Sequence, residues 1–213
     1  MKGTLTFATR LILFITLPAT VGLILLRVPI IEVLFEGGQF NAQSTALTAW
    51  ALLFFAVGLS AFSMIKVIVQ AFYALHDTWT PVVIGFFSLL VNIALNFLFF
   101  RWLRNGGPPL ATSLAAFFDT IALMIVFRLR YGTLGLRSVG RSCVKFLLAS
   151  AVMGVVAYVF IRIPGFYAGA WPQRVLSLMT TIALAGGTYF GAARLLRFDE
   201  LQEMGGIFGH RSP

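Results

Sequence analysis

Residues 88–100 read SLLVNIALNFLFF, an apolar run that carries two amides, Asn92 and Asn96, four residues apart. This spacing places both side chains on one face of a helix. A helix this apolar is typical of a membrane span, where a polar group without a partner costs roughly 2 kcal/mol or more. We therefore expect the two amides to meet another helix, a water-filled cavity or an ion. Helix packing and cavity lining explain the spacing equally well.

The composition extends this interpretation to the whole chain. Of its 213 residues, 59% are hydrophobic and only 11% are charged, and the mean hydropathy is +0.93. A soluble protein of this size needs more polar surface than these residues supply. The net charge is +9, but the basic residues lie between the hydrophobic runs and do not form a stripe with aromatic residues, which argues against nucleic acid as a partner.

The sequence offers little to an enzyme or a resident cofactor. It has a single cysteine, Cys143, and its two histidines, His76 and His210, lie far apart. No Cys/His cluster has metal-ligand spacing, and no nucleophile elbow, phosphate loop or pair of carboxylates on one membrane face occurs. We expect neither catalysis nor a bound cofactor.

Six segments are apolar and long enough to cross a bilayer, which takes about 20 residues per helix. Glycine- and proline-rich turns separate them. The prediction is an all-α membrane protein with one transmembrane domain over residues 1–213. Its helices are expected near 9–28, 46–74, 81–101, 109–128, 145–163 and 175–196.

The distribution of basic residues predicts the orientation of these spans. If the N-terminus is cytoplasmic, the outer side holds Arg27, Arg101, Arg104, Arg162 and Arg174. The cytoplasmic side then holds twice as many, namely Lys2, Arg10, Arg128, Arg130, Arg137, Arg141, Lys145, Arg194, Arg197 and Arg211. Because basic residues favour the cytoplasmic side, both termini are expected there.

Polar residues on the second span form a candidate transport face. Lys66, Gln70, Tyr73 and Asp77 follow helical spacings of four, three and four. A lysine within a membrane helix faces a cavity or a partner, or it snorkels to the interface. Lys66 lies eleven residues before Asp77, about 16 Å along a helix, so the cavity is the favoured interpretation.

The fourth span adds Thr112 and Asp119, seven residues apart on nearly the same face. Asp119 is the only acid within an apolar span, so it must be protonated, paired or hydrated. Lys66 is a candidate partner. We predict that Asp119→Asn impairs transport more than Asp77→Asn does.

Two further patterns concern helix geometry. Pro18 falls inside the first span and leaves backbone groups unpaired, which the hydroxyls of Thr16 and Thr20 are expected to satisfy. The last span carries small residues at every fourth position, a pattern typical of close helix packing. These residues are Ala183, Gly187 and Gly191.

Together, several short motifs resemble the MurJ/MviN family of lipid II flippases, within the multidrug/oligosaccharidyl-lipid/polysaccharide exporter superfamily. They cover about residues 7–130 and follow the family order. The motifs are LPATVGL at 17–23, PI at 29–30, LFEGGQF at 34–40, Lys66 with FYA at 72–74, DTWTP at 77–81, NIALN at 92–96 and LATSLAA at 110–116.

The resemblance implies a transporter of two pseudo-symmetric lobes and roughly fourteen helices, which works by alternating access. This chain would then be a C-terminal fragment, with the head-group site in the missing N-terminal part of the same protein. In some members a sodium ion binds at positions that correspond to Asn92, Asn96 and Thr112. Asn96 stands where an acid is usual, and Asp119 suggests that the charge has been relocated.

The implied function is translocation of the undecaprenyl-linked peptidoglycan precursor, lipid II, from the inner to the outer leaflet of the bacterial cytoplasmic membrane, for cell-wall biosynthesis. Sodium or the membrane potential would drive it, and the partners would be lipid II and membrane lipids. The alternatives are an exporter of another lipid-linked oligosaccharide or of drugs, and a membrane subunit that does not transport.

Overall fold

The computed structural model describes residues 2–35, 37, 40–103, 106–132, 136–167, 169–196 and 198. Of the residues discussed above, Arg104, Arg197, His210 and Arg211 lie outside these ranges, as do Glu36, Gly38 and Gln39 of the LFEGGQF motif. The described residues form six long helices and no strand, which confirms the all-α membrane fold. The helices are α1 (Lys2–Phe35), α2 (Ala42–Ala74), α3 (Trp79–Leu103), α4 (Gly107–Tyr131), α5 (Leu136–Arg162) and α6 (Trp171–Leu195).

Each expected span falls on one of these helices, but α1 and α5 begin seven and nine residues earlier than the apolar pattern indicates. Both extensions are rich in polar and basic residues, for example Arg141 in α5. A helix can continue beyond the hydrocarbon layer into the interface, where such residues are favourable. Hydropathy therefore locates the part of each helix that lies within the hydrocarbon layer and misses the helix ends outside it.

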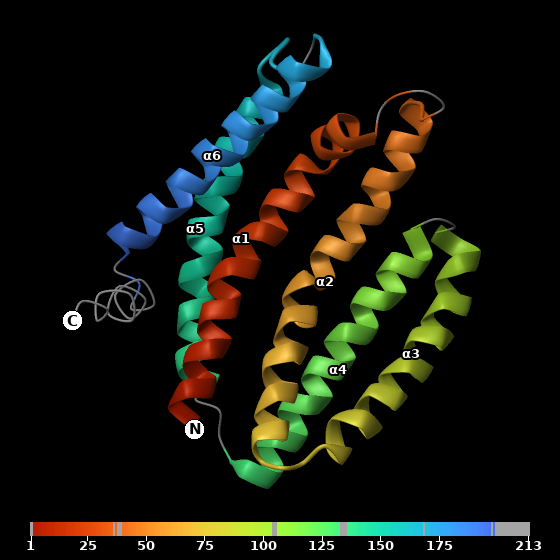
Figure 1. Cartoon of the computed structure of the whole chain (residues 1–213), viewed down its shortest axis with the longest axis vertical. Helices are drawn as coiled ribbons and strands as arrows, with labels where there is room; N and C mark the ends of the chain where they lie inside the picture. The colour runs from red at the N-terminus through yellow and green to blue at the C-terminus, as the bar shows by residue number, and fades with distance from the viewer. Residues whose placement is uncertain are drawn as a thin grey trace, which may run out of the picture.

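The helices stand side by side in one curved layer, in the order α6, α5, α1, α2, α4, α3 (Figure 1). Hydroxyl groups fix α4 between its two neighbours. Ser113 and Thr120 donate to the carbonyls of Phe54 and Ala61 on α2, and Ser88 on α3 donates to Ala115 on α4. Such bonds hold helices together where lipid offers no hydrophobic drive for association.

The loop between α2 and α3 begins with a tight, hydrogen-bonded turn. The N–H groups of His76 and Asp77 donate to the carbonyls of Tyr73 and Phe72, and His76 adopts a left-handed conformation with φ 59°. This bonding pattern is a Schellman motif, which ends a helix by satisfying its last carbonyls. α2 therefore stops at Ala74, and Asp77 lies beyond it.

The structure corrects two expectations about helix geometry. The hydroxyls of Thr16 and Thr20 have no hydrogen-bond partner, so they do not satisfy the groups that Pro18 frees. The small-residue ladder of α6 is exposed, and nothing lies within 4 Å of a Cβ placed at Gly187 or Gly191. The predicted close packing of this ladder is wrong within the described part of the chain.

Candidate functional site

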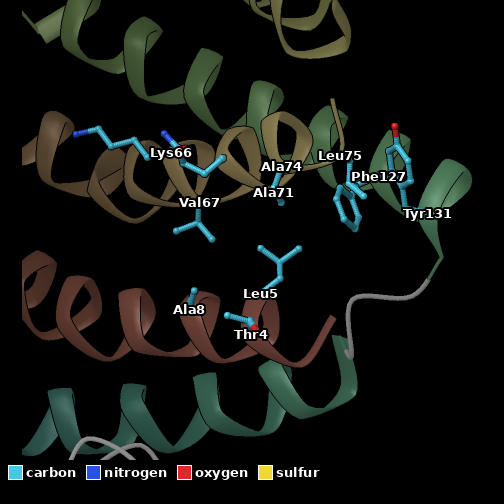
Figure 2. A pocket seen from close by; sticks show the side chains of 11 residues that line it. Thr4, Leu5, Ala8, Lys66, Val67, Ala71, Ala74, Leu75, Phe127 and Tyr131 are labelled. Atoms are coloured by element: carbon cyan, nitrogen blue, oxygen red, sulfur yellow. The ribbon is translucent and has the colours of Figure 1, made fainter. Parts of the chain in front are cut away.

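A groove of about 690 Å³ opens between α1, α2 and the end of α4; we call it the α1–α2 groove (Figure 2). Its walls are mostly apolar. In Figure 2, Val67 and Leu5 point from α2 and α1 into the space between the two helices. The lining residues are Thr4, Leu5, Ala8, Lys66, Val67, Gln70, Ala71, Ala74, Leu75, Phe127 and Tyr131.

Lys66 and Gln70 both line this groove, as their shared helix face predicts. Both side chains are exposed. Figure 2 shows that the Lys66 side chain runs along α2 and carries its ammonium group away from the end marked by Phe127 and Tyr131. The groove therefore combines a long apolar surface with one positive charge, an arrangement that suits an anionic amphiphile.

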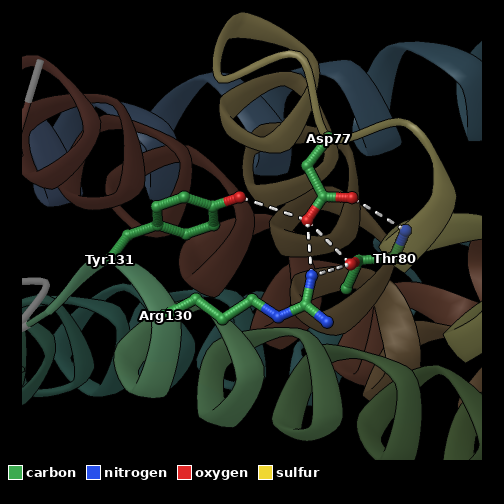
Figure 3. Close-up of polar contacts among 4 residues, drawn as sticks. All are labelled: Asp77, Thr80, Arg130 and Tyr131. Atoms are coloured by element: carbon green, nitrogen blue, oxygen red, sulfur yellow. Dashed lines mark hydrogen bonds and ion pairs between the residues drawn. The ribbon is translucent and has the colours of Figure 1, made fainter.

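Asp77 belongs to a different site, a network that joins the α2–α3 loop to the end of α4 (Figure 3). One oxygen of its carboxylate, Oδ2, accepts from the Thr80 hydroxyl at 2.7 Å, from Arg130 Nη1 at 3.0 Å and from the Tyr131 hydroxyl at 3.1 Å. Its other oxygen, Oδ1, accepts from the Thr80 N–H at 3.0 Å and caps the start of α3.

These contacts stabilise the ionised carboxylate. The hydrogen bonds from Thr80, followed by the Tyr131 hydroxyl and the Arg130 charge, hold the pKa of Asp77 below its ordinary value despite its partial burial. Arg130 also donates to the Thr80 hydroxyl at 2.8 Å. The sequence prediction that Asp77 continues the Lys66 face is therefore wrong, because the helix ends three residues before it.

Asp119 lies apart from the α1–α2 groove. Its Oδ1 is buried without a hydrogen-bond partner, and no ion pair joins it to Lys66 among the residues with described positions. Its neighbour Thr120 bonds to α2 and Ala115, one turn earlier, bonds to α3. Asp119 thus faces the junction of α2, α3 and α4, in the membrane interior.

The two asparagines bond to each other. Asn96 Nδ2 donates at 2.9 Å to both the side-chain and the backbone oxygen of Asn92. The Asn96 amide nitrogen and the Asn92 amide oxygen therefore have hydrogen-bond partners within α3. Thr112 on α4 donates to the Pro108 carbonyl at 2.8 Å. Because α3 and α4 run antiparallel with Ser88 bonded to Ala115, Asn92 and Thr112 lie at a similar level on adjacent helices.

The structure therefore separates into three places the residues that the sequence predicted to share one chamber. Lys66 and Gln70 line the α1–α2 groove, whose lining includes none of Asn92, Asn96, Thr112 and Asp119. Those four lie on α3 and α4. Sequence reasoning missed Thr80, Arg130 and Tyr131 at the Asp77 network. The Asp-x-x-Thr spacing of a helix cap was the only local signal for any of them.

Comparison with known proteins gives a consistent result. A family model described as lipid II flippase MurJ matches residues 1–177. Two relatives named "Probable lipid II flippase MurJ" cover most of the chain. That of Rickettsia prowazekii is 33% identical over 89% of this chain and 38% of its own length, and that of Rhizobium tropici is 37% identical over 87% and 35%.

A solved structure also matches. The structure titled "Lipid II flippase MurJ, inward closed conformation" superposes with a TM-score of 0.73 and 26% identity, over 90% of this chain and 39% of that one. The chain thus spans less than two fifths of the length of the relatives it matches.

Proposed function

The chain belongs to the lipid II flippase MurJ family of multi-pass bacterial membrane proteins, and from this premise we propose that it forms the C-terminal part of a transporter that moves lipid II across the cytoplasmic membrane. The observation that carries the proposal is the agreement of fold with the solved flippase over 90% of the chain. The remaining part of the protein supplies the opposing lobe. Transport changes the position of the substrate and leaves its covalent structure intact.

The α1–α2 groove gives this lobe a role in handling the substrate. Its apolar walls fit a polyprenyl chain, which gains roughly 0.8 kcal/mol for each buried CH₂ group relative to water. The Lys66 ammonium at its edge fits a phosphate oxygen of the diphosphate link. In this proposal Lys66 and Gln70 contact the substrate, and Asp77 fixes the loop and helix end beside them.

The amides and hydroxyl on α3 and α4 suit a coupling role. Asn92, Asn96 and Thr112 offer neutral oxygens on adjacent helices, and Asp119 offers a carboxylate oxygen without a partner one turn past Ala115. Oxygen donors of this kind suit a sodium ion. We infer that sodium dependence lies at Asn92, Asn96 and Thr112, or that the membrane potential acts on Asp119, about 10 Å along α4 from Thr112.

The test uses the full-length protein in cells depleted of their own lipid II flippase. Lys66→Met should abolish or strongly reduce rescue of growth, and Lys66→Arg should retain it because the charge remains. Lys145→Met removes a lysine from α5, outside the groove, and should grow as the parent does. Equal growth of all three variants would remove Lys66 from the mechanism.

A second comparison separates coupling from stability. Asp119→Asn should reduce lipid II flux, measured as accumulation of precursor on the inner leaflet, and Asp77→Asn should chiefly lower thermal stability. If variants at Lys66, Asn92 and Asp119 change stability but never flux, the chain is a structural subunit. If flux of the parent protein is the same without sodium, Asn92, Asn96 and Thr112 do not bind a coupling ion.

A further inference from the structure

α1 has a backbone carbonyl, that of Phe14, which lacks its usual hydrogen-bond donor within the helix. Pro18 has no N–H, so the Phe14 carbonyl four residues earlier lacks the donor that every regular helical turn provides. The Tyr189 hydroxyl of α6 donates to this carbonyl at 2.7 Å, and both residues are buried. A side chain from the last helix therefore replaces the missing hydrogen bond of the first.

α6 makes a second bond of the same kind near the other end of α1. The Trp171 indole N–H donates at 2.9 Å to the Val33 carbonyl. Because α1 ends at Phe35, this carbonyl belongs to the last turn, whose oxygens have no partner within the helix. Along α6 the two donors are about 27 Å apart, and along α1 the two acceptors are about 28 Å apart. The two helices are thus joined at matched positions.

Aromatic packing supports the Tyr189 contact. The Tyr189 and Phe14 rings lie 5.3 Å apart, and Phe14 also contacts Phe146 on α5 at 5.6 Å and Phe198 after α6 at 6.0 Å. This packing does not depend on the tyrosine hydroxyl. Tyr189→Phe therefore removes the hydrogen bond and keeps the ring contacts.

The segment of α1 before Pro18 forms one wall of the α1–α2 groove. Thr4, Leu5 and Ala8 line the groove from this segment and face the α2 residues around Lys66. A helix bends most easily where a backbone hydrogen bond is absent. The groove wall can therefore move about Pro18 unless the Phe14 carbonyl is held.

We propose that Tyr189 is a positioning residue: its bond to Phe14 holds the first half of α1 toward α6, on the side away from α2, and so keeps the α1–α2 groove wide. Trp171 fixes the far end of the same helix. The inference rests on the proposed function only where it concerns transport. Tyr189 lies on α6, after residue 177, where the segment matched by the family model ends.

The test measures the groove directly in the full-length protein. Spin labels at Gly3→Cys on α1 and Thr78→Cys in the α2–α3 loop report the distance across the groove mouth, in a background where Cys143 and any cysteine in the rest of the protein are replaced by alanine. A Cβ at Gly3 meets nothing within 4 Å, and Thr78 is exposed, so both positions accept a label. Tyr189→Phe should add a shorter distance component, with the ratio of narrowed to parent-like forms rising about tenfold for loss of a buried bond.

Tyr158→Phe is the matched control. Its hydroxyl bonds to Arg162 on the exposed face of α5, so its loss should leave the distance distribution unchanged. A label pair at Trp79 and Leu129, on α3 and α4, should be unaffected by either variant. Trp171→Phe should shift the Gly3–Thr78 distance less than Tyr189→Phe does, because it acts beyond Pro18.

Two outcomes would overturn the inference. The first is an unchanged Gly3–Thr78 distribution in Tyr189→Phe. The second is an equal change in the Trp79–Leu129 pair, which would indicate general loosening. Flux is measured separately: if Lys66→Met leaves transport intact while Tyr189→Phe still narrows the groove, the proposed role of the groove fails and the positioning role stands.

Discussion

Asp77 accepts hydrogen bonds from the Thr80 backbone and side chain, from Arg130 and from Tyr131. Its carboxylate therefore caps α3 and ties the α2–α3 loop to α4. Sequence spacing alone places it on the face of Lys66, because a repeat of three and four residues continues past the point where the helix ends. The Schellman motif at His76 breaks this repeat, and the acid becomes a structural residue.

This role makes a prediction about pH. The pKa of Asp77 is lower in the folded protein than its ordinary value, so its contribution to stability is present above about pH 4 and is lost as the pH falls through the folded value. Thermal unfolding in detergent should show Asp77→Asn less stable than the parent at pH 7. The difference should shrink below about pH 4. A constant difference from pH 7 to pH 3 would contradict the role of the charge.

Packing of α2 against α4 depends on a small residue at Gly58. A Cβ at this position would overlap the Ser113 hydroxyl oxygen and would lie 2.8 Å from the Ser113 Cβ. Ser113 in turn donates to the Phe54 carbonyl one turn before Gly58. The close approach of the two helices and the bond between them thus require the same glycine. The sequence pattern instead predicted close packing at Ala183, Gly187 and Gly191 of α6, and all three are exposed.

Two alanine substitutions separate these glycines. Gly58→Ala should lower the free energy of unfolding by about 1–3 kcal/mol, because the added methyl group must push α2 and α4 apart. Gly187→Ala adds the same group where nothing lies within 4 Å, and it should be neutral or raise stability by up to about 1 kcal/mol through helix propensity. Thermal unfolding of both variants in one detergent gives the comparison. Equal destabilisation would show that Gly58 has no special packing role.

The whole molecule is a single curved layer with α3 and α6 at its edges (Figure 1). Such a layer leaves large apolar side chains exposed on its faces; Phe97 and Leu129, for example, are 81% and 80% exposed. Lipid and the rest of the protein must cover these faces, since water would not. The layer is therefore consistent with one part of a larger membrane protein, as the length of its relatives indicates.

The proposed orientation can be tested at the ends of the layer. With the N-terminus in the cytoplasm, the α2–α3 loop is cytoplasmic and the α5–α6 turn is outside. In a background where Cys143 and any cysteine in the rest of the protein are replaced by alanine, Ala170→Cys should react with a membrane-impermeant maleimide in intact spheroplasts. Thr78→Cys should react only after permeabilisation; both positions are exposed. The reverse pattern would invert the topology and place Arg128 and Arg130 outside.

The sequence by itself determined that the chain spans a membrane with six helices, and it identified Lys66 and Gln70 on one face. Hydropathy and helical periodicity are local properties, so a single segment contains all the information that these predictions need. The tertiary structure alone decided which groups meet. Arg130 reaches Asp77 across 53 residues, and Tyr189 reaches Phe14 across 175. No local pattern carries such pairings, because they follow from the order in which the helices pack. The partner of the carbonyl freed by Pro18 is therefore a tyrosine five helices away in the chain, and neither neighbouring threonine.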